Sequence, residues 1–408
     1  MSFGQRKFRY AHSESAAHEA QAADPERAGE IIKALIGSVL VKQPVLFPSQ
    51  GAIDSERAIS VWTWLVRDVE PALFHEAKTA LSPDGTQQLR TTLCAKISSL
   101  IAEKIAQAKE NPDFDRRLTI QLGGQEIRAR LSQIKNAFKY HQLLPKAVAF
   151  GRAINGVRDE HSLKLALKSF PVNDPGVFAL MMQAAIGQIT NPNRLLCVIL
   201  SLSGGETQAA VTEAGFAPVI EAMIAHAQNQ LWVFNSSFGT FADIDLVCQA
   251  LERYHRLIRA ISTITDGDKS SQWAEKVSGL TRHMSELIEP KLTNVDALIR
   301  QSLRKPRIGP DQVDNDLLLE ALNGLYLLAA AREARDSLAL NSLVNNAWNE
   351  TGKALEVLVS RNLEAFRHSP QSNIVAQRLN AGIKMAEVRF NPEYADILKR
   401  ARDGASRL

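Results

Sequence analysis

Apolar residues recur at helical spacing along most of this 408-residue chain. The clearest example lies between residues 86 and 109, where the apolar positions include Leu89, Leu93, Ile97, Leu100, Ile101 and Ile105. Spacings of three and four residues place such side chains on one face of an α-helix. The 22 glycines and 16 prolines make up about 9% of the chain, below the roughly 12% of average usage, which leaves few turns for short strands. We therefore expect an all-α fold, built of antiparallel helical bundles or an irregular α-solenoid.

One segment, near residues 117–130, also carries a strand pattern. The apolar residues Leu118, Ile120, Leu122, Ile127, Ala129 and Leu131 alternate with polar ones on either side of Gly123-Gly124. Two alternating runs around a glycine pair indicate a short β-hairpin. A helix is the alternative, because Ile127, Leu131 and Ile134 are also spaced by four and three residues. We expect the hairpin, with its second strand continuing into a helix and its face packed on helices.

Proline, glycine and N-cap residues divide the chain into regions. Residues 1–23 are polar and alanine-rich without a sustained period, so we expect a disordered tail. Asp24 and Asp54 stand where helix N-caps are expected. The expected regions after the tail are 24–142, a helical region that would contain the hairpin; 143–303, a central helical domain; 304–310, a linker; and 311–408, a C-terminal helical domain.

The C-terminal region has the longest expected helices, over about 313–335 and 338–367. The second helix places Leu340, Val344, Ala347, Trp348, Leu355, Leu358 and Leu363 on one face. A stripe of this kind faces either the core of a bundle or a partner. We expect these two helices to supply packing or interaction surface.

Compartment and membrane features of the sequence are few. No secretory leader follows the basic N-terminus, and no apolar run approaches the 18 or so residues of a membrane span. Cys94, Cys197 and Cys248 lie far apart in apolar patterns without a CxxC pair, so we expect buried free thiols and neither a disulfide framework nor a zinc site. The expected location is the cytoplasm.

Catalytic signatures are missing from the sequence. It contains no P-loop, no GxGxxG after a strand, no HExxH, no GxSxG and no EF-hand loop. The nine histidines show no pairing at the one-turn spacing that places two metal ligands on one helix face. We therefore assign no catalytic, cofactor-binding or metal-ligating residue, and an enzyme is the less favoured class.

A basic helical face is one of two candidate contact regions. Arg253, Arg256 and Arg259 are three residues apart and could follow a phosphate backbone. Glu252 is adjacent, however, and charges of both signs alternate along the chain, whose net charge is only +4. A solvated helical face is therefore favoured, and a nucleic-acid partner is not expected.

The other candidate contact region is the N-terminal tail. Aromatic side chains in a segment without a core of its own are available to a partner. The predicted partner-binding residues are Phe3, Arg6, Lys7, Phe8, Arg9 and Tyr10.

Three functional hypotheses follow. The favoured one is an intracellular helical scaffold, adaptor or regulatory protein that acts through protein–protein contacts, including self-association. The alternative is an enzyme whose site is assembled across a helical bundle, which predicts a deep polar pocket with shifted pKa values. The third is nucleic-acid binding through the arginine face, which predicts an affinity that falls steeply with salt.

Overall fold

The computed structural model describes residues 24–238, 243–306 and 311–405. These residues are mainly α-helical, which confirms the all-α class expected from the sequence. The chain forms two compact units. Unit 1 contains the described residues up to Asn229 together with Thr263–Asp268, and unit 2 contains Gln230–Ser262 and the residues from Lys269 onward. The region boundaries drawn from the sequence stay a prediction; residues 1–23 and part of the predicted linker, 307–310, lie outside the described residues.

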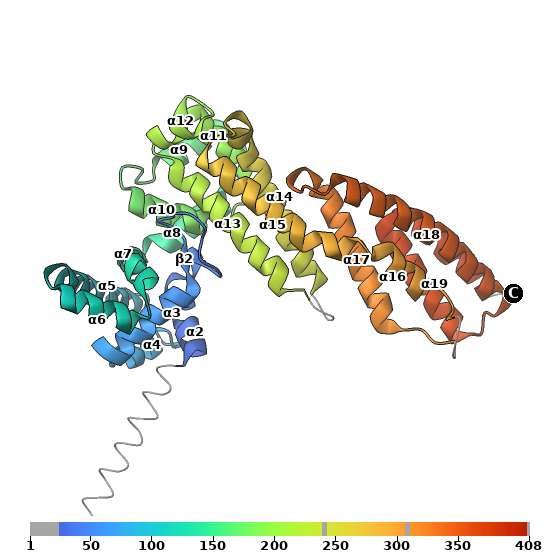
Figure 1. The fold of residues 1–408 in the computed structure, drawn as a ribbon, viewed down its shortest axis with the longest axis horizontal. Coiled ribbons are helices and arrows are strands. Elements are labelled where there is room, and N and C mark those ends of the chain that lie inside the picture. The colour runs from blue at the N-terminus through green and yellow to red at the C-terminus, as the bar shows by residue number, and fades with distance from the viewer. Residues whose placement is uncertain (1–23, 239–242, 307–310, 406–408) are drawn as a thin grey trace, which may run out of the picture. The chain divides into compact units, whose positions relative to one another are not determined.

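Unit 1 is built of helices of 6 to 24 residues (Figure 1). They are α2 (Pro25–Ile36), α3 (Ser55–Trp64), α4 (Leu73–Ala80), α5 (Gln87–Glu110), α6 (Pro112–Leu122), α7 (Gln125–Lys139), α8 (Leu143–Ile154), α9 (Glu160–Lys168), α10 (Pro175–Ile186), α11 (Pro192–Ser203) and α12 (Gln208–Glu213). Asp24 and Asp54 cap α2 and α3 as expected, each accepting a backbone hydrogen bond. Helix α10 is buried on every side from Val177 to Ile186, so it lies in the core of this unit.

Two further helices contribute residues to both units, α13 (Ala217–Ser236) and α14 (Ile244–Gly267). The part of α13 that belongs to unit 1 is buried at most positions. Unit 1 also contains one turn of 3-10 helix, Gly37–Val39, and one of π-helix, Leu65–Val69.

A short parallel strand pair is the one strand structure among the described residues. Strand β1 (Leu40–Val41) pairs with β2 (Ile53–Asp54), with Leu40 opposite Ile53. The loop between the strands is held by side-chain amides of α13. Gln228 accepts the Leu46 N–H (3.1 Å) and donates to the Pro44 carbonyl (2.8 Å). Asn229 accepts the N–H of Lys42 at 2.9 Å.

The prediction of a β-hairpin near residues 117–130 is wrong. That segment forms α6 and α7, joined by a turn at Gly123, whose φ of 94° ends α6 in the left-handed region. Leu118 and Leu122 are buried one helical turn apart, whereas Ile120 between them is 78% exposed. The exposed apolar residue Ile120 therefore gives this helical segment the alternating pattern that is typical of a strand.

Unit 2 includes a bundle of longer helices, drawn in orange to red in Figure 1. They are α15 (Gln272–Leu292), α16 (Val295–Ser302), α17 (Asn315–Glu333), α18 (Asn341–His368), α19 (Asn373–Arg389) and α20 (Pro392–Ala405), with a 3-10 turn at Arg335–Ser337. Helix α18 packs against α16, α17, α19 and α20. The two long helices expected after residue 311 are therefore present as α17 and α18.

The cysteine expectation is only partly confirmed. Cys94 is buried and Cys248 is half-buried, but Cys197 is exposed. On α11 the core takes Leu195, Leu196 and Val198, and the helical period leaves position 197 on the outer side. Within the described residues no helix combines the length and apolar character that a membrane span needs.

Candidate interaction surface

The residues predicted as contact sites fall in two places. Phe3, Arg6, Lys7, Phe8, Arg9 and Tyr10 lie outside the described residues, so this contact stays a prediction. The arginine face lies on α14 within unit 2.

The three arginines of α14 do not share one environment. Arg256 and Arg259 are exposed, and Arg256 forms an ion pair with Glu252 one turn away. Arg253 is half-buried, and its pKa is lowered by burial and by the charge of Arg256. Steps of three residues on a helix with 3.6 residues per turn drift around the axis, which carries Arg253 toward the interior. The basic face itself stays a prediction.

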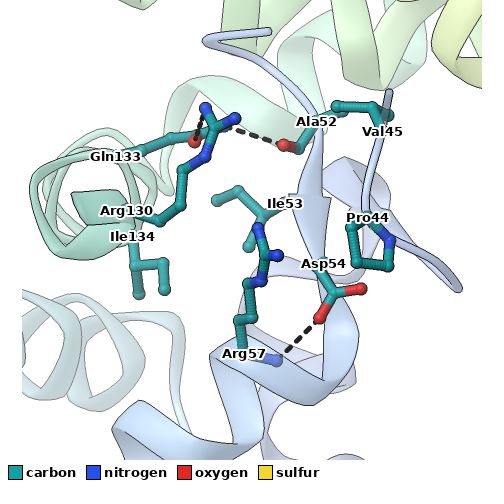
Figure 2. A pocket seen from close by; sticks show the side chains of 9 residues that line it. All are labelled: Pro44, Val45, Ala52, Ile53, Asp54, Arg57, Arg130, Gln133 and Ile134. Atoms are coloured by element: carbon teal, nitrogen blue, oxygen red, sulfur yellow. Dashed lines mark hydrogen bonds between the residues drawn. The ribbon is translucent and has the colours of Figure 1, made fainter. Parts of the chain in front are cut away.

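A small cavity in unit 1 lies beside β2 (Figure 2). Its volume of about 10 Å³ has room for one water at most. Gln133 of α7 donates to the Ala52 carbonyl at 2.8 Å, and Arg130 of the same helix donates to the Ser49 carbonyl at 3.2 Å. These bonds fix the extended segment before α3, so the cavity is a structural feature and too small for a ligand.

Asp54 on the wall of this cavity is a buried carboxyl with a structural role. Its Oδ1 accepts the Arg57 N–H at 2.8 Å and caps α3 (Figure 2), while Oδ2 has no hydrogen-bond partner among the described residues. Burial raises the pKa of Asp54, and the hydrogen bond from Arg57 opposes that rise. The Arg57 guanidinium itself pairs with Glu126 at 2.5 Å.

Two larger, open cavities lie in unit 2, with volumes of about 660 and 540 Å³. The larger is lined by apolar side chains of α15, α16 and α17 together with carboxylates at the start of α17, namely Asp314, Asp316 and Glu320. The smaller is lined mainly by polar residues around Arg300 and Arg304. Neither lining contains a histidine or a cysteine. No group of three or more side chains in the described part of the chain could hold a metal ion.

A cluster of arginine and aromatic side chains lies on unit 2 around Trp348. Trp348 of α18 is half-exposed. The guanidinium carbon of Arg389, at the end of α19, lies 4.0 Å from the centre of the indole, and that of Arg332, near the end of α17, lies 4.4 Å from it. Both distances are well within the roughly 6 Å limit of a cation–π interaction.

Arg389 is held in this position by three contacts. Its Nε donates to the Trp348 carbonyl at 2.9 Å, and its guanidinium carbon lies 5.1 Å from the centre of the Phe390 ring. The third contact is with Gly352, one turn after Trp348 on α18. A Cβ at residue 352 would lie 2.6 Å from Nη2 of Arg389. Glycine inside a helix costs about 1 kcal/mol relative to alanine, and here it leaves the space that the guanidinium occupies.

The charges at Trp348 are unbalanced. Within the part of the chain that the structure describes, neither Arg332 nor Arg389 forms an ion pair with a carboxylate. Burial lowers the pKa of Arg389, the charge of Arg332 lowers it further, and Glu356 raises it. Two guanidiniums thus share one indole and repel each other, while the nearby carboxylate only partly offsets their charge.

Aromatic rings extend this surface. The rings of Phe390 and Tyr394 lie 4.9 Å apart, and both residues are half-exposed. We call the five residues Arg332, Trp348, Arg389, Phe390 and Tyr394 the Trp348 surface. Tryptophan, tyrosine and arginine are the side chains that contribute most to binding energy at protein interfaces.

One isolated carboxyl also has a shifted pKa. Burial raises the pKa of Glu221 on α13 to about 7, and no hydrogen bond or ion pair to its carboxyl is found within the described residues. Ile220 and Ala222 on either side of it are buried. A carboxyl group with a shifted pKa can mark a functional site, but Glu221 lines none of the three cavities described above.

The sequence pointed to the region of the Trp348 surface without identifying it. Trp348 was placed on an interaction or packing face, but Arg332 and Arg389 are 16 and 41 residues from it and meet only through the packing of α17, α18 and α19. The local signal in the sequence was a glycine, Gly352, one turn after this tryptophan inside a long expected helix. Comparison with models of protein families, with curated proteins and with solved structures finds no match to this chain.

Proposed function

We propose that this chain is a cytoplasmic α-helical adaptor, scaffold or regulatory protein, and that it binds another protein through the Trp348 surface. The observation that carries the proposal is the pair of arginines against one half-exposed indole, neither of which forms an ion pair with a carboxylate among the described residues. The two like charges repel each other, and a partner of opposite charge at this point would relieve that repulsion.

The geometry also supports a preformed contact. The guanidinium of Arg389 is fixed by a carbonyl, an indole and a phenyl ring. Fixing a side chain before binding reduces the conformational entropy that association removes, by about 0.5–1.5 kcal/mol for a long side chain. The N-terminal residues Phe3 to Tyr10 remain a second predicted contact, independent of this one.

A site-directed cross-link tests the proposal. In the full chain, Tyr394 is replaced by a photoreactive phenylalanine analogue. The variant is added to native cell extract, and the mixture is irradiated. We expect a discrete protein adduct that disappears when Trp348→Ala is added. Arg361→Gln is the matched control, because Arg361 is exposed on the same helix and has no ion pair among the described residues. That change should leave the adduct intact. An adduct unaffected by Trp348→Ala, or no adduct at all, would overturn the proposal.

A further inference from the structure

The chemistry of the Trp348 surface identifies the kind of partner it fits. We propose that this surface recognises an acidic protein segment, one of whose carboxylates accepts hydrogen bonds from both Arg332 and Arg389 while an adjacent apolar side chain packs on Phe390 and Tyr394. This inference rests on the proposed function and specifies the partner's chemistry.

Charge is the first argument. The guanidinium carbons of Arg332 and Arg389 lie 4.4 and 4.0 Å from the centre of the same indole, so two like charges are held near each other and each destabilises the other. A carboxylate that pairs with both removes that repulsion and gains charge-assisted hydrogen bonds, which are about twice as strong as neutral ones. Arg332 is exposed and therefore accessible to a partner.

Orientation is the second argument. Arg389 uses Nε for the carbonyl of Trp348, which leaves its terminal nitrogens as donors. The planar guanidinium presents its donors as a fork that matches the two oxygens of a carboxylate. Nη2 occupies the space that Gly352 leaves on α18, so the packing of α18 against α19 sets the orientation of the fork, and Nη1 is the terminal nitrogen that these contacts do not hold.

The surroundings favour a single carboxylate over the row of phosphates that a nucleic acid presents. The exposed carboxylates Glu333, Glu350 and Glu356 lie on the same two helices as Arg332 and Trp348. A phosphate backbone requires a row of cations, and its binding strength grows with the number of phosphates neutralised. Two arginines surrounded by glutamates can bind one anionic group. This arrangement fits a single carboxylate of a partner whose neighbouring residues are apolar.

The test uses the purified full chain and three synthetic probes: a dodecapeptide of alternating glutamate and leucine, its twin with glutamine for glutamate, and a single-stranded DNA dodecamer. Binding is followed by tryptophan fluorescence, and the variant Trp348→Phe identifies the part of the signal that Trp348 contributes among the five tryptophans. We expect the glutamate peptide to bind, and the glutamine twin to bind at least roughly tenfold more weakly, since hydrogen bonds to charged groups are the stronger ones. Affinity should also fall with rising salt.

Variants separate this site from general electrostatics. Arg332→Gln and Arg389→Gln should each weaken the glutamate peptide roughly tenfold, and the double variant by less than the product, because both arginines pair with one carboxylate. Gly352→Ala keeps every charge but displaces the Arg389 guanidinium, so it should weaken binding severalfold. The matched control Arg361→Gln should leave binding unchanged.

Three outcomes would overturn the inference: equal binding of the glutamine twin, loss of binding in Arg361→Gln as large as in Arg389→Gln, or tighter binding of the DNA than of the glutamate peptide through the same arginines. If no probe binds while a cellular protein still cross-links in a Trp348-dependent way, the acidic-segment inference fails and the proposed function stands. If the cross-link also fails, both are wrong.

Discussion

Replacing Glu221 by glutamine is expected to remove a pH-dependent loss of stability. The residue is half-buried on α13, and desolvation raises the pKa of its carboxyl from the usual 4.5 to about 7. In the unfolded chain the group titrates near its usual pKa, so the folded state binds the proton more tightly. Stability contributed by the protonated form is fully present below about pH 4.5 and is lost as the pH rises through 7.

The size of this effect follows from the two pKa values. One pKa unit corresponds to about 1.4 kcal/mol, so a rise from 4.5 to about 7 implies that ionised Glu221 destabilises the fold by about 3 kcal/mol at pH 8. Glutamine cannot ionise and has nearly the same shape. Glu221→Gln should therefore raise the free energy of unfolding at pH 8 by about 1–3 kcal/mol, the lower figure allowing for the buried amide.

Urea denaturation of the full chain and of Glu221→Gln, at pH 5 and at pH 8, measures the difference. We expect the two midpoints to differ clearly at pH 8 and the difference to be much smaller at pH 5. Glu213→Gln, at an exposed position at the end of α12, is the matched control and should show no such pH-dependent difference. Equal midpoints for Glu221→Gln and the unmodified chain at pH 8 would refute the reasoning.

Three further predictions concern packing, a buried charge and thiol access. Gly151→Ala should lower the free energy of unfolding by about 1–3 kcal/mol, measured by urea, because a Cβ there would overlap the carbonyl oxygen of Ala185 on α10. Arg378 is only 4% exposed and pairs with Asp311 at 2.6 Å. Asp311→Ala leaves this arginine as a buried charge without its partner, so it should destabilise unit 2 by about 3–5 kcal/mol. Hydrogen exchange on α19 measures the loss. Cys197 should react with a thiol reagent in the native state, because it is exposed.

Each of these predictions has its own control. Gly279→Ala lies inside α15 with open space around the added Cβ and should gain up to about 1 kcal/mol; a loss as large as that at Gly151 would contradict the packing argument. For Asp311→Ala, unchanged exchange on α19 would show that the ion pair stabilises nothing. Burial raises the pKa of Cys94 to about 12, so native labelling of Cys94 as fast as that of Cys197 would contradict its burial.

Much of the architecture could be predicted from local patterns. The helical spacing of apolar residues and the scarcity of glycine and proline indicated the all-α class, and aspartate N-caps marked the starts of α2 and α3. Local patterns failed where a short run fits two periods. Leu118, Ile120 and Leu122 alternate as in a strand, but only tertiary packing determines that Ile120 faces solvent.

The strand pair and the Trp348 surface could not be predicted for a different reason. Each depends on residues far apart in the sequence. The segment between β1 and β2 is fixed by Gln228 and Asn229, almost 190 residues further along the chain. The Trp348 surface exists because α17 and α19 bring two arginines to one indole. Spacing along a single helix contains no information about either arrangement.

We propose that the chain acts through a protein contact made at Trp348. The most direct test is the dissociation constant of the cross-linked protein, once purified, for the unmodified chain, Trp348→Ala and Arg361→Gln. We expect Trp348→Ala to weaken binding by roughly thirtyfold or more, the size of effect typical of an interface hot spot, and Arg361→Gln to have no effect. Dissociation constants within about twofold of each other for all three proteins, well below the tenfold change that about 1.4 kcal/mol produces, would contradict the claim.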